Sequence, residues 1–198
     1  MIKPQRYLPN DTEWQEKEGV RRFMELAERH NKQFNKWVST GTGSFVDMWV
    51  EDYTGGTMAV ENKVRTIMHK KYDDVMIEPS KLNNLLTIYE KYGIHPLYIN
   101  YYNDGYTYIF DIARIEEEGL THTFGFKPGE KIKYWEQGVQ YTKIEDRYFI
   151  PAEYAIEIAP DFTKEKSYDF STPKITRLPY VISLEEPWPA ARTNKLIH

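Results

Sequence analysis

The sequence contains no cysteine, so it forms no disulfides and offers no thiolate ligands to a metal ion. Its five histidines lie far apart along the chain, without the short spacings that mark a zinc site. We therefore expect no structural zinc.

A long apolar run is also missing. No stretch approaches the roughly 20 apolar residues that span a bilayer, and the start MIKPQRYLPND lacks the apolar core of a signal peptide. Hydrophobic residues make up 40% of the chain and charged residues 28%, which is ordinary for a globular protein. With 198 residues, one globular domain in the cytoplasm is the expectation, with no membrane partner.

Positive charge is not in excess, since 26 Lys and Arg residues face 30 Asp and Glu residues. A protein that coats nucleic acid without specificity needs many cations to neutralise phosphates, so this class is excluded, whereas a local basic site is not.

Familiar catalytic motifs are missing too. Residues 41–44 lack the Gly-Lys-Ser/Thr of a P-loop, and no G-x-S-x-G or H-E-x-x-H occurs.

What is present is a regular alternation of helical and strand patterns. The apolar residues Val20, Phe23, Ala27 and Phe34 recur at helical spacing, and Asn103-Asp104-Gly105 marks a hairpin turn. The predicted order is helix, strand, strand, helix, strand, strand, at residues 12–40, 44–50, 57–65, 79–92, 94–102 and 106–115.

Two positions in the first pair of strands carry unusual polar residues. Asp47 interrupts an apolar strand, and a buried carboxylate without a partner costs several kcal/mol, so it must be ligated, hydrogen-bonded or at a strand end. Glu61 and Lys63 are two residues apart, which places both side chains on one face of the second strand, beside Ala59 and Arg65.

The run GSFVDMWVEDYTGGTMAVENKVR resembles the D…(D/E)-x-K signature of the PD-(D/E)xK nuclease superfamily, although Val46 stands where proline often precedes the first Asp. The resemblance implies an α/β fold of the restriction-endonuclease-like class, with a central mixed β-sheet flanked by helices. It also implies an Mg²⁺-dependent deoxyribonuclease, with Mn²⁺ as a substitute. Asp47, Glu61 and the backbone carbonyl of Asn62 would hold the ion, and Lys63 would position or activate water.

The same resemblance suggests two further site residues. Glu16 is in helical phase with Val20 and Phe23, so it should face the sheet and complete the metal site; the alternative is that it only favours the helix dipole. Lys81 on the second helix would approach the phosphate, or its stem would simply cover apolar surface.

DNA is the expected partner. A basic cluster of Arg65, His69, Lys70 and Lys71 follows the catalytic strand, where it would contact the phosphate backbone; a solvated loop is the competing interpretation. The five tyrosines of the hairpin invite base stacking, but we interpret them as core residues. Because duplex DNA has two strands, we also allow for a homodimer.

The resemblance divides the chain into a nuclease-like core at residues 1–115 and an accessory β portion at 116–198. The latter has strands at 139–144 and 148–150, a turn at 127–130 and an extended tail from Pro160, packed on the same domain. The competing hypothesis is a non-catalytic module that binds nucleic acid or protein on the same fold, with Asp47 and Glu61 in ordinary hydrogen bonds. Substrate structure and endonuclease or exonuclease mode are left open.

Overall fold

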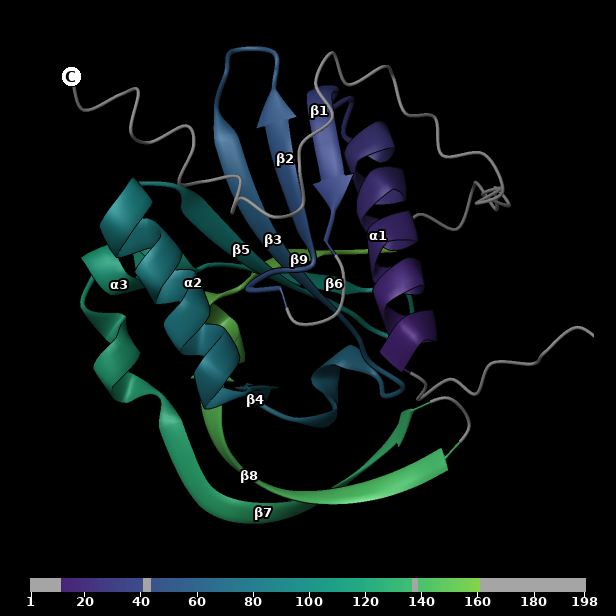
Figure 1. The fold of residues 1–198 in the computed structure, drawn as a ribbon, viewed down its shortest axis with the longest axis vertical. Coiled ribbons are helices and arrows are strands. Elements are labelled where there is room, and N and C mark those ends of the chain that lie inside the picture. The colour runs from purple at the N-terminus through teal and green to yellow at the C-terminus, as the bar shows by residue number, and fades with distance from the viewer. Residues whose placement is uncertain (1–11, 41–43, 137–138, 161–198) are drawn as a thin grey trace, which may run out of the picture.

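The computed structural model describes residues 12–40, 44–136 and 139–160, which form two β-sheets with helices packed on the larger one (Figure 1). The larger sheet has six strands in the order β1-β2-β3-β5-β6-β9, and the smaller has three in the order β4-β8-β7. The helices are α1 (Thr12–Arg29), α2 (Pro79–Tyr92) and α3 (Ile112–Glu117), with short 3-10 turns η1 (His69–Lys71), η2 (Leu120–Thr123) and η3 (Ala152–Tyr154). The strands are β1 (Phe34–Ser39), β2 (Met48–Asp52), β3 (Thr57–Val64), β4 (Asp74–Ile77), β5 (His95–Tyr101), β6 (Thr107–Asp111), β7 (Gly125–Glu136), β8 (Val139–Pro151) and β9 (Ile156–Ile158).

The predicted fold class, a central mixed sheet flanked by helices with an accessory β portion, is confirmed. In the larger sheet β3 and β5 run parallel, while the other neighbours are antiparallel. The α1 helix packs on one face of this sheet, and α2 and α3 pack on the other (Figure 1).

The predicted alternation along β3 is also confirmed. Val60 and Val64 are buried in the cluster that includes α1, whereas Ala59 is buried in the cluster that includes α2. The α1 helix approaches β3 closely at Gly19, where an added Cβ would lie 2.7 Å from the Cβ of Asn62. Glycine at this position therefore lets the helix pack directly against the strand that carries the site.

The predicted helix from residue 12 to 40 is wrong in its second half. The helix ends at Arg29, Asn31 adopts a positive φ of 52°, and Phe34 begins strand β1, which pairs with β2. Phe34 matched the helical spacing, yet its contact with the helix is a tertiary one: its ring stacks on Phe23 with centroids 5.5 Å apart.

The predicted strand from 106 to 115 is also too long. It stops at Asp111, whose side chain accepts a hydrogen bond from the backbone N–H of Arg114 and so caps α3. An Asp placed before an apolar run is a helix-start signal, and here it overrides the strand propensity of Ile112 and Ile115.

The accessory portion belongs to both sheets. Its predicted turn at 127–130 is wrong, because β7 continues through an irregularity between Lys127 and Glu130, and its two predicted strands are one continuous strand, β8. β8 pairs with β4, and β9 adds a sixth strand to the main sheet beside β6. Apart from Pro160 itself, the predicted tail lies outside the described residues.

The tyrosines of the β5–β6 hairpin mainly form core, as interpreted. Tyr98, Tyr101, Tyr102 and Tyr108 are buried, while Tyr106 stacks on His69 with ring centroids 3.6 Å apart. Among the described helices, none combines the length and the apolar character needed to cross a membrane.

Candidate active site

Asp47 lies just before β2 rather than inside it, because the predicted strand 44–50 begins only at Met48. Residues 44–47 form a bend that Thr40 holds, since its backbone N–H donates to the Asp47 carbonyl at 2.8 Å. Asp47 still lies beside β3: its N–H donates to the Val60 carbonyl at 3.1 Å, and its Oδ2 accepts from the N–H of Asn62 at 2.7 Å. The side chain is thus held at the end of β2, directed at the middle of β3.

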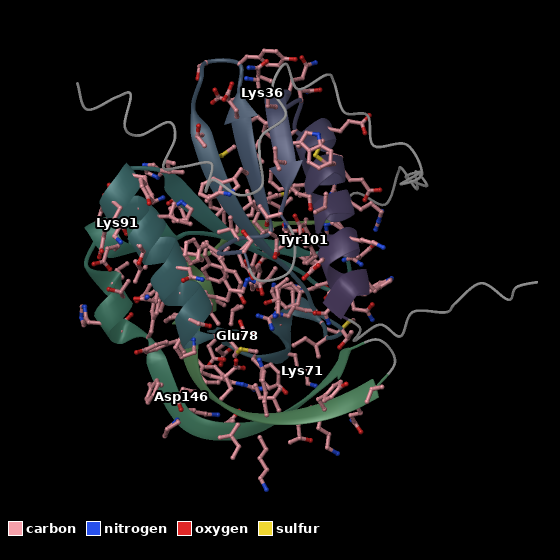
Figure 2. The ribbon with its side chains drawn as sticks, in the orientation of Figure 1. Lys36, Lys71, Glu78, Lys91, Tyr101 and Asp146 are labelled. Atoms are coloured by element: carbon pink, nitrogen blue, oxygen red, sulfur yellow. The ribbon has the colours of Figure 1, made fainter. Side chains whose placement is uncertain are left out.

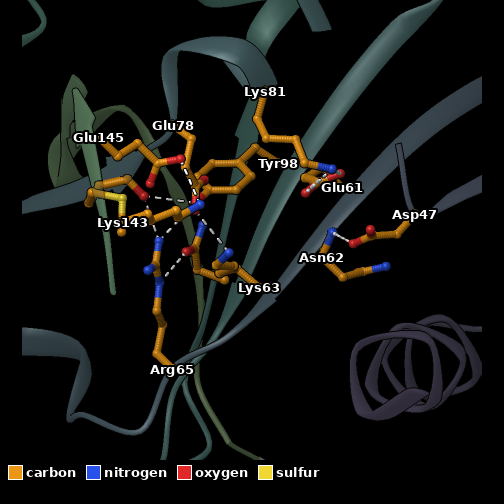
Figure 3. Close-up of polar contacts among 12 residues, drawn as sticks. Asp47, Glu61, Asn62, Lys63, Arg65, Glu78, Lys81, Tyr98, Lys143 and Glu145 are labelled. Atoms are coloured by element: carbon orange, nitrogen blue, oxygen red, sulfur yellow. Dashed lines mark hydrogen bonds and ion pairs between the residues drawn. The ribbon is translucent and has the colours of Figure 1, made fainter. Parts of the chain in front are cut away.

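Glu61 is buried on β3, on the face covered by α2, and is only 4% exposed. The Lys81 ammonium, from the first turn of α2, lies 3.0 Å from Oε1 of Glu61 and 3.1 Å from Oε2 (Figure 3). The structure therefore brings together Glu61 and Lys81, two residues that the sequence placed at the site on different elements.

The two carboxylates share one electrostatic environment. Burial and the nearby Asp47 charge raise the pKa of Glu61 to about 8. Burial also raises the pKa of Asp47, although the Asn62 N–H and the charges of Lys81 and Lys63 oppose the shift. Shifts of this kind, with burial and a charged neighbour as causes, are typical of functional sites.

Lys63 projects from the same face of β3 as Glu61, as predicted, but it pairs with a different acid. Its ammonium donates to Oε1 of Glu78 at 3.1 Å (Figure 3). Burial opposes the charge of Glu78, yet the charge of Lys63 outweighs it, and the pKa of Glu78 falls to about 2.

Glu78 was not predicted as a site residue. It precedes Pro79 at the start of α2 and directly follows β4, which is not among the predicted strands (Figure 2). The signal available was the short alternation of Val75 and Ile77 followed by a proline that starts a helix, which marks the junction where Glu78 lies.

The predicted basic cluster divides into two parts. The Arg65 guanidinium donates to Asn100, to the Met76 carbonyl and to the Tyr98 hydroxyl, at 2.7, 2.6 and 2.8 Å. The His69 ring lies 2.7 Å from Asp104 and stacks on Tyr106. Both side chains are thus engaged in holding the fold. Lys70 and Lys71 on η1 are exposed, so they are the members that face solvent.

Two predicted ligands remain to be placed. The backbone N–H of Asn62 bonds Asp47, and because the N–H and C=O of one strand residue point to the same edge, its carbonyl lies on the Asp47 side of β3. Glu16 is half-buried on α1 and makes contacts within the protein, so its role at the site stays a prediction. Among the described residues, no three acids or histidines gather as a metal-binding group.

This arrangement can bind a hard cation only through the two carboxylates and a backbone oxygen. When ionised, Asp47 and Glu61 would supply negative charge to such an ion, and the positive charges of Lys63 and Lys81 act on both carboxylates. Such a site suits a reaction in which a cation and ammonium groups stabilise developing negative charge on oxygen.

Comparisons with known proteins give little beyond this geometry. No family model matches the chain, and no curated protein matches it. One solved structure that matches is Hjc, a Holliday junction resolvase from the hyperthermophilic archaeon Archaeoglobus fulgidus. It shares 12% sequence identity with this chain at a TM-score of 0.42, and the match covers 71% of this chain and 92% of that chain. At this level of similarity, function has to be argued from the site itself.

Proposed function

We propose that this protein is a metal-dependent nuclease that hydrolyses phosphodiester bonds in DNA. One observation carries the proposal: the charge of Asp47 helps to raise the pKa of the buried Glu61, and the charges of Lys63 and Lys81 act on both carboxylates. A carboxylate that stays buried without full compensation destabilises the fold, so a strongly raised pKa beside a charged neighbour marks a candidate functional site.

Mg²⁺, with Mn²⁺ as a substitute, fits the residues present. Both ions prefer oxygen ligands, and the site offers two carboxylates and the Asn62 carbonyl on one side of β3. Positive charge would relieve the raised pKa of Glu61, which is still about 8 beside Lys81 and Lys63. When bound, the ion would supply Lewis-acid polarisation of the phosphate and lower the pKa of water.

The lysines would act on the other reacting groups. Lys63, on the same face of β3 as Glu61, would orient the attacking water and stabilise negative charge as it develops. Lys81 would leave one or both oxygens of Glu61 and contact the scissile phosphate. Lys70 and Lys71, which are exposed after β3, would contact the DNA backbone on either side.

Cleavage assays test this proposal directly. Purified protein is incubated with single-stranded, duplex and branched DNA, in Mg²⁺, Mn²⁺ or EDTA, beside Glu61→Gln. The matched control is Glu118→Gln, which makes the same change in an exposed ion pair with Arg114 far along the chain. We expect cleavage that needs metal and Glu61 and survives in the control. Cleavage that continues in EDTA, or in Glu61→Gln, would contradict the proposal.

One observation favours the second candidate, a non-catalytic binding module. Each acid already has a protein partner, since Asp47 accepts from Asn62 and Glu61 from Lys81. Calorimetry with Mg²⁺ and Mn²⁺ separates the two candidates: binding that disappears in Asp47→Asn supports the nuclease, and absence of binding in the wild type supports the module.

A further inference from the structure

Glu78 is a buried acid for which the proposed reaction has so far given no role. Its side chain is 15% exposed, and it lies at the position that caps α2 without making a side-chain capping bond. Instead the carboxylate is directed away from its own helix, to the ammonium of Lys63 at 3.1 Å. The ion pair with Lys63 therefore takes the place of a capping bond at this helix start.

The backbone that carries Glu78 is fastened to both sheets. Two residues earlier, the carbonyl of Met76 accepts from Arg65 at 2.6 Å and from the Tyr98 hydroxyl at 2.8 Å, which ties β4 to β3 and β5 (Figure 3). On its other side β4 pairs with β8, with Ile77 opposite Tyr148. The backbone at Glu78 is thus fixed in place, so its carboxylate can hold the flexible side chain of Lys63.

Lys63 needs such a fixed partner because Glu61, an acid nearer to it in sequence, could compete for its ammonium. Glu61 lies two residues away on the same face of β3, and the charge of Lys63 acts on both Glu61 and Asp47. A lysine side chain is a flexible four-carbon chain that ends in a compact charge. Without another partner, Lys63 could therefore turn toward Glu61 and pair with it. An ion pair between Lys63 and Glu61 would occupy a proposed metal ligand and move the ammonium away from the attacking water.

We propose that Glu78 is a positioning residue that holds the Lys63 ammonium apart from Glu61, in the place where it acts during phosphodiester hydrolysis. This inference rests on the proposed nuclease function, since it assigns Glu78 a role in that reaction. Glu78 acts through Lys63 and does not itself touch the substrate.

The first test needs no catalysis. The ammonium of a lysine held in a buried ion pair exchanges its protons slowly enough to give a ¹⁵N-edited NMR signal, whereas free surface lysines lose theirs. In metal-free wild-type protein we expect such a signal that Lys63→Ala removes. It should also vanish or shift in Glu78→Gln, return in part in Glu78→Asp, and stay unchanged in the control Glu118→Gln. A Lys63 signal that is unaffected by Glu78→Gln would overturn the inference.

The second test is a double-mutant cycle on DNA cleavage. Glu78→Gln should lower kcat about ten- to a hundredfold with little change in KM, because a misplaced catalytic group affects the chemical step. In the Lys63→Ala background the same substitution should have no further effect. An equal loss in both backgrounds would show that Glu78 acts on the fold or the metal rather than through Lys63.

The two tests also separate this inference from the proposed function. If the wild type cleaves no DNA, the nuclease proposal fails and the NMR signal alone decides whether Glu78 holds Lys63. Thermal unfolding of each variant identifies any that do not fold, in which case Glu78→Asp, which keeps the charge, decides in place of Glu78→Gln.

Discussion

Two glutamates of this site each pair with a lysine at about the same distance, and yet their pKa values move in opposite directions. Glu78 lies 3.1 Å from Lys63 and its pKa falls to about 2. Glu61 lies 3.0 Å from Lys81 and its pKa rises to about 8. Glu61 is 4% exposed and the Glu78 side chain only 15%, so burial alone does not explain the opposite shifts in pKa.

The difference comes from the neighbours. Asp47 adds its negative charge to the burial of Glu61, whereas Arg65 adds positive charge near Glu78. Lys63 and Arg65 together outweigh the burial of Glu78, whereas Lys81 and Lys63 do not offset both the burial of Glu61 and the charge of Asp47. The shortage of positive charge is confined to Asp47 and Glu61, which is where we propose the divalent ion.

The largest expected difference between the pairs is in catalysis. Glu61→Gln removes a proposed metal ligand, so we expect it to lower kcat by about a thousandfold or more, which corresponds to roughly 4 kcal/mol in the barrier. Glu78→Gln leaves the ligands in place and should lower kcat less. Single-turnover cleavage of one DNA substrate at saturating Mg²⁺ measures both. If Glu78→Gln lowers kcat as much as Glu61→Gln does, the two glutamates would not differ in their contribution to catalysis.

The next difference concerns stability at neutral pH. Because the folded pKa of Glu78 lies below its unfolded value, its ion pair stabilises the fold above the unfolded pKa and loses this effect as pH falls toward 2. Glu78→Gln should therefore lower the free energy of unfolding by about 2 to 3 kcal/mol at pH 7, and by almost nothing near pH 2. Urea unfolding across this range measures it, and a loss that does not depend on pH would count against the ion pair as its source.

Glu61 should show the opposite sign. Its folded pKa lies above the unfolded value, so the fold is progressively destabilised as pH rises from about 4.5 to about 8. In metal-free protein, Glu61→Gln should raise the free energy of unfolding at pH 9 by about 1 to 3 kcal/mol, reduced by the loss of the Lys81 partner, and should change little at pH 4. The same urea series measures it. If Glu61→Gln destabilises the protein at pH 9, then Glu61 is already well compensated without a metal.

The Glu61 side of this comparison could be predicted from the sequence, and the Glu78 side could not. Asp47 lies directly before β2, and Glu61 and Lys63 lie on β3, which a short turn joins to β2. Local alternation was enough to place Asp47 beside the strand that carries Glu61 and Lys63, and to give the face that those two residues share. Lys81 followed from the family resemblance. The same local rules failed at Phe34, where a tertiary ring contact with Phe23 imitated helical spacing.

Glu78 was missed because its position depends on distant pairing. β4 is four residues long and becomes a strand by pairing with β8, which lies more than seventy positions later, as in Val75 opposite Ile150. For the same reason Arg65 was predicted to bind DNA: nothing local shows that the carbonyl of Met76 and the side chain of Asn100 lie within its reach. The pairing of β4 with β8, which local sequence does not show, places Glu78 beside Lys63 and the Met76 carbonyl beside Arg65.

The smallest expected effect tests why the pKa values of Glu61 and Glu78 shift in opposite directions. If the Asp47 charge is what separates Glu61 from Glu78, then Asp47→Asn should lower the pKa of Glu61, while the pKa of Glu78 should fall little or not at all. Titration of ¹³C-labelled glutamate carboxyls by NMR, assigned with Glu61→Gln and Glu78→Gln, measures both in metal-free protein. A Glu61 pKa that stays near 8 without Asp47 would mean that burial alone raises it. The two acids would then be separate buried groups, and the argument that they form one metal site would lose its electrostatic basis.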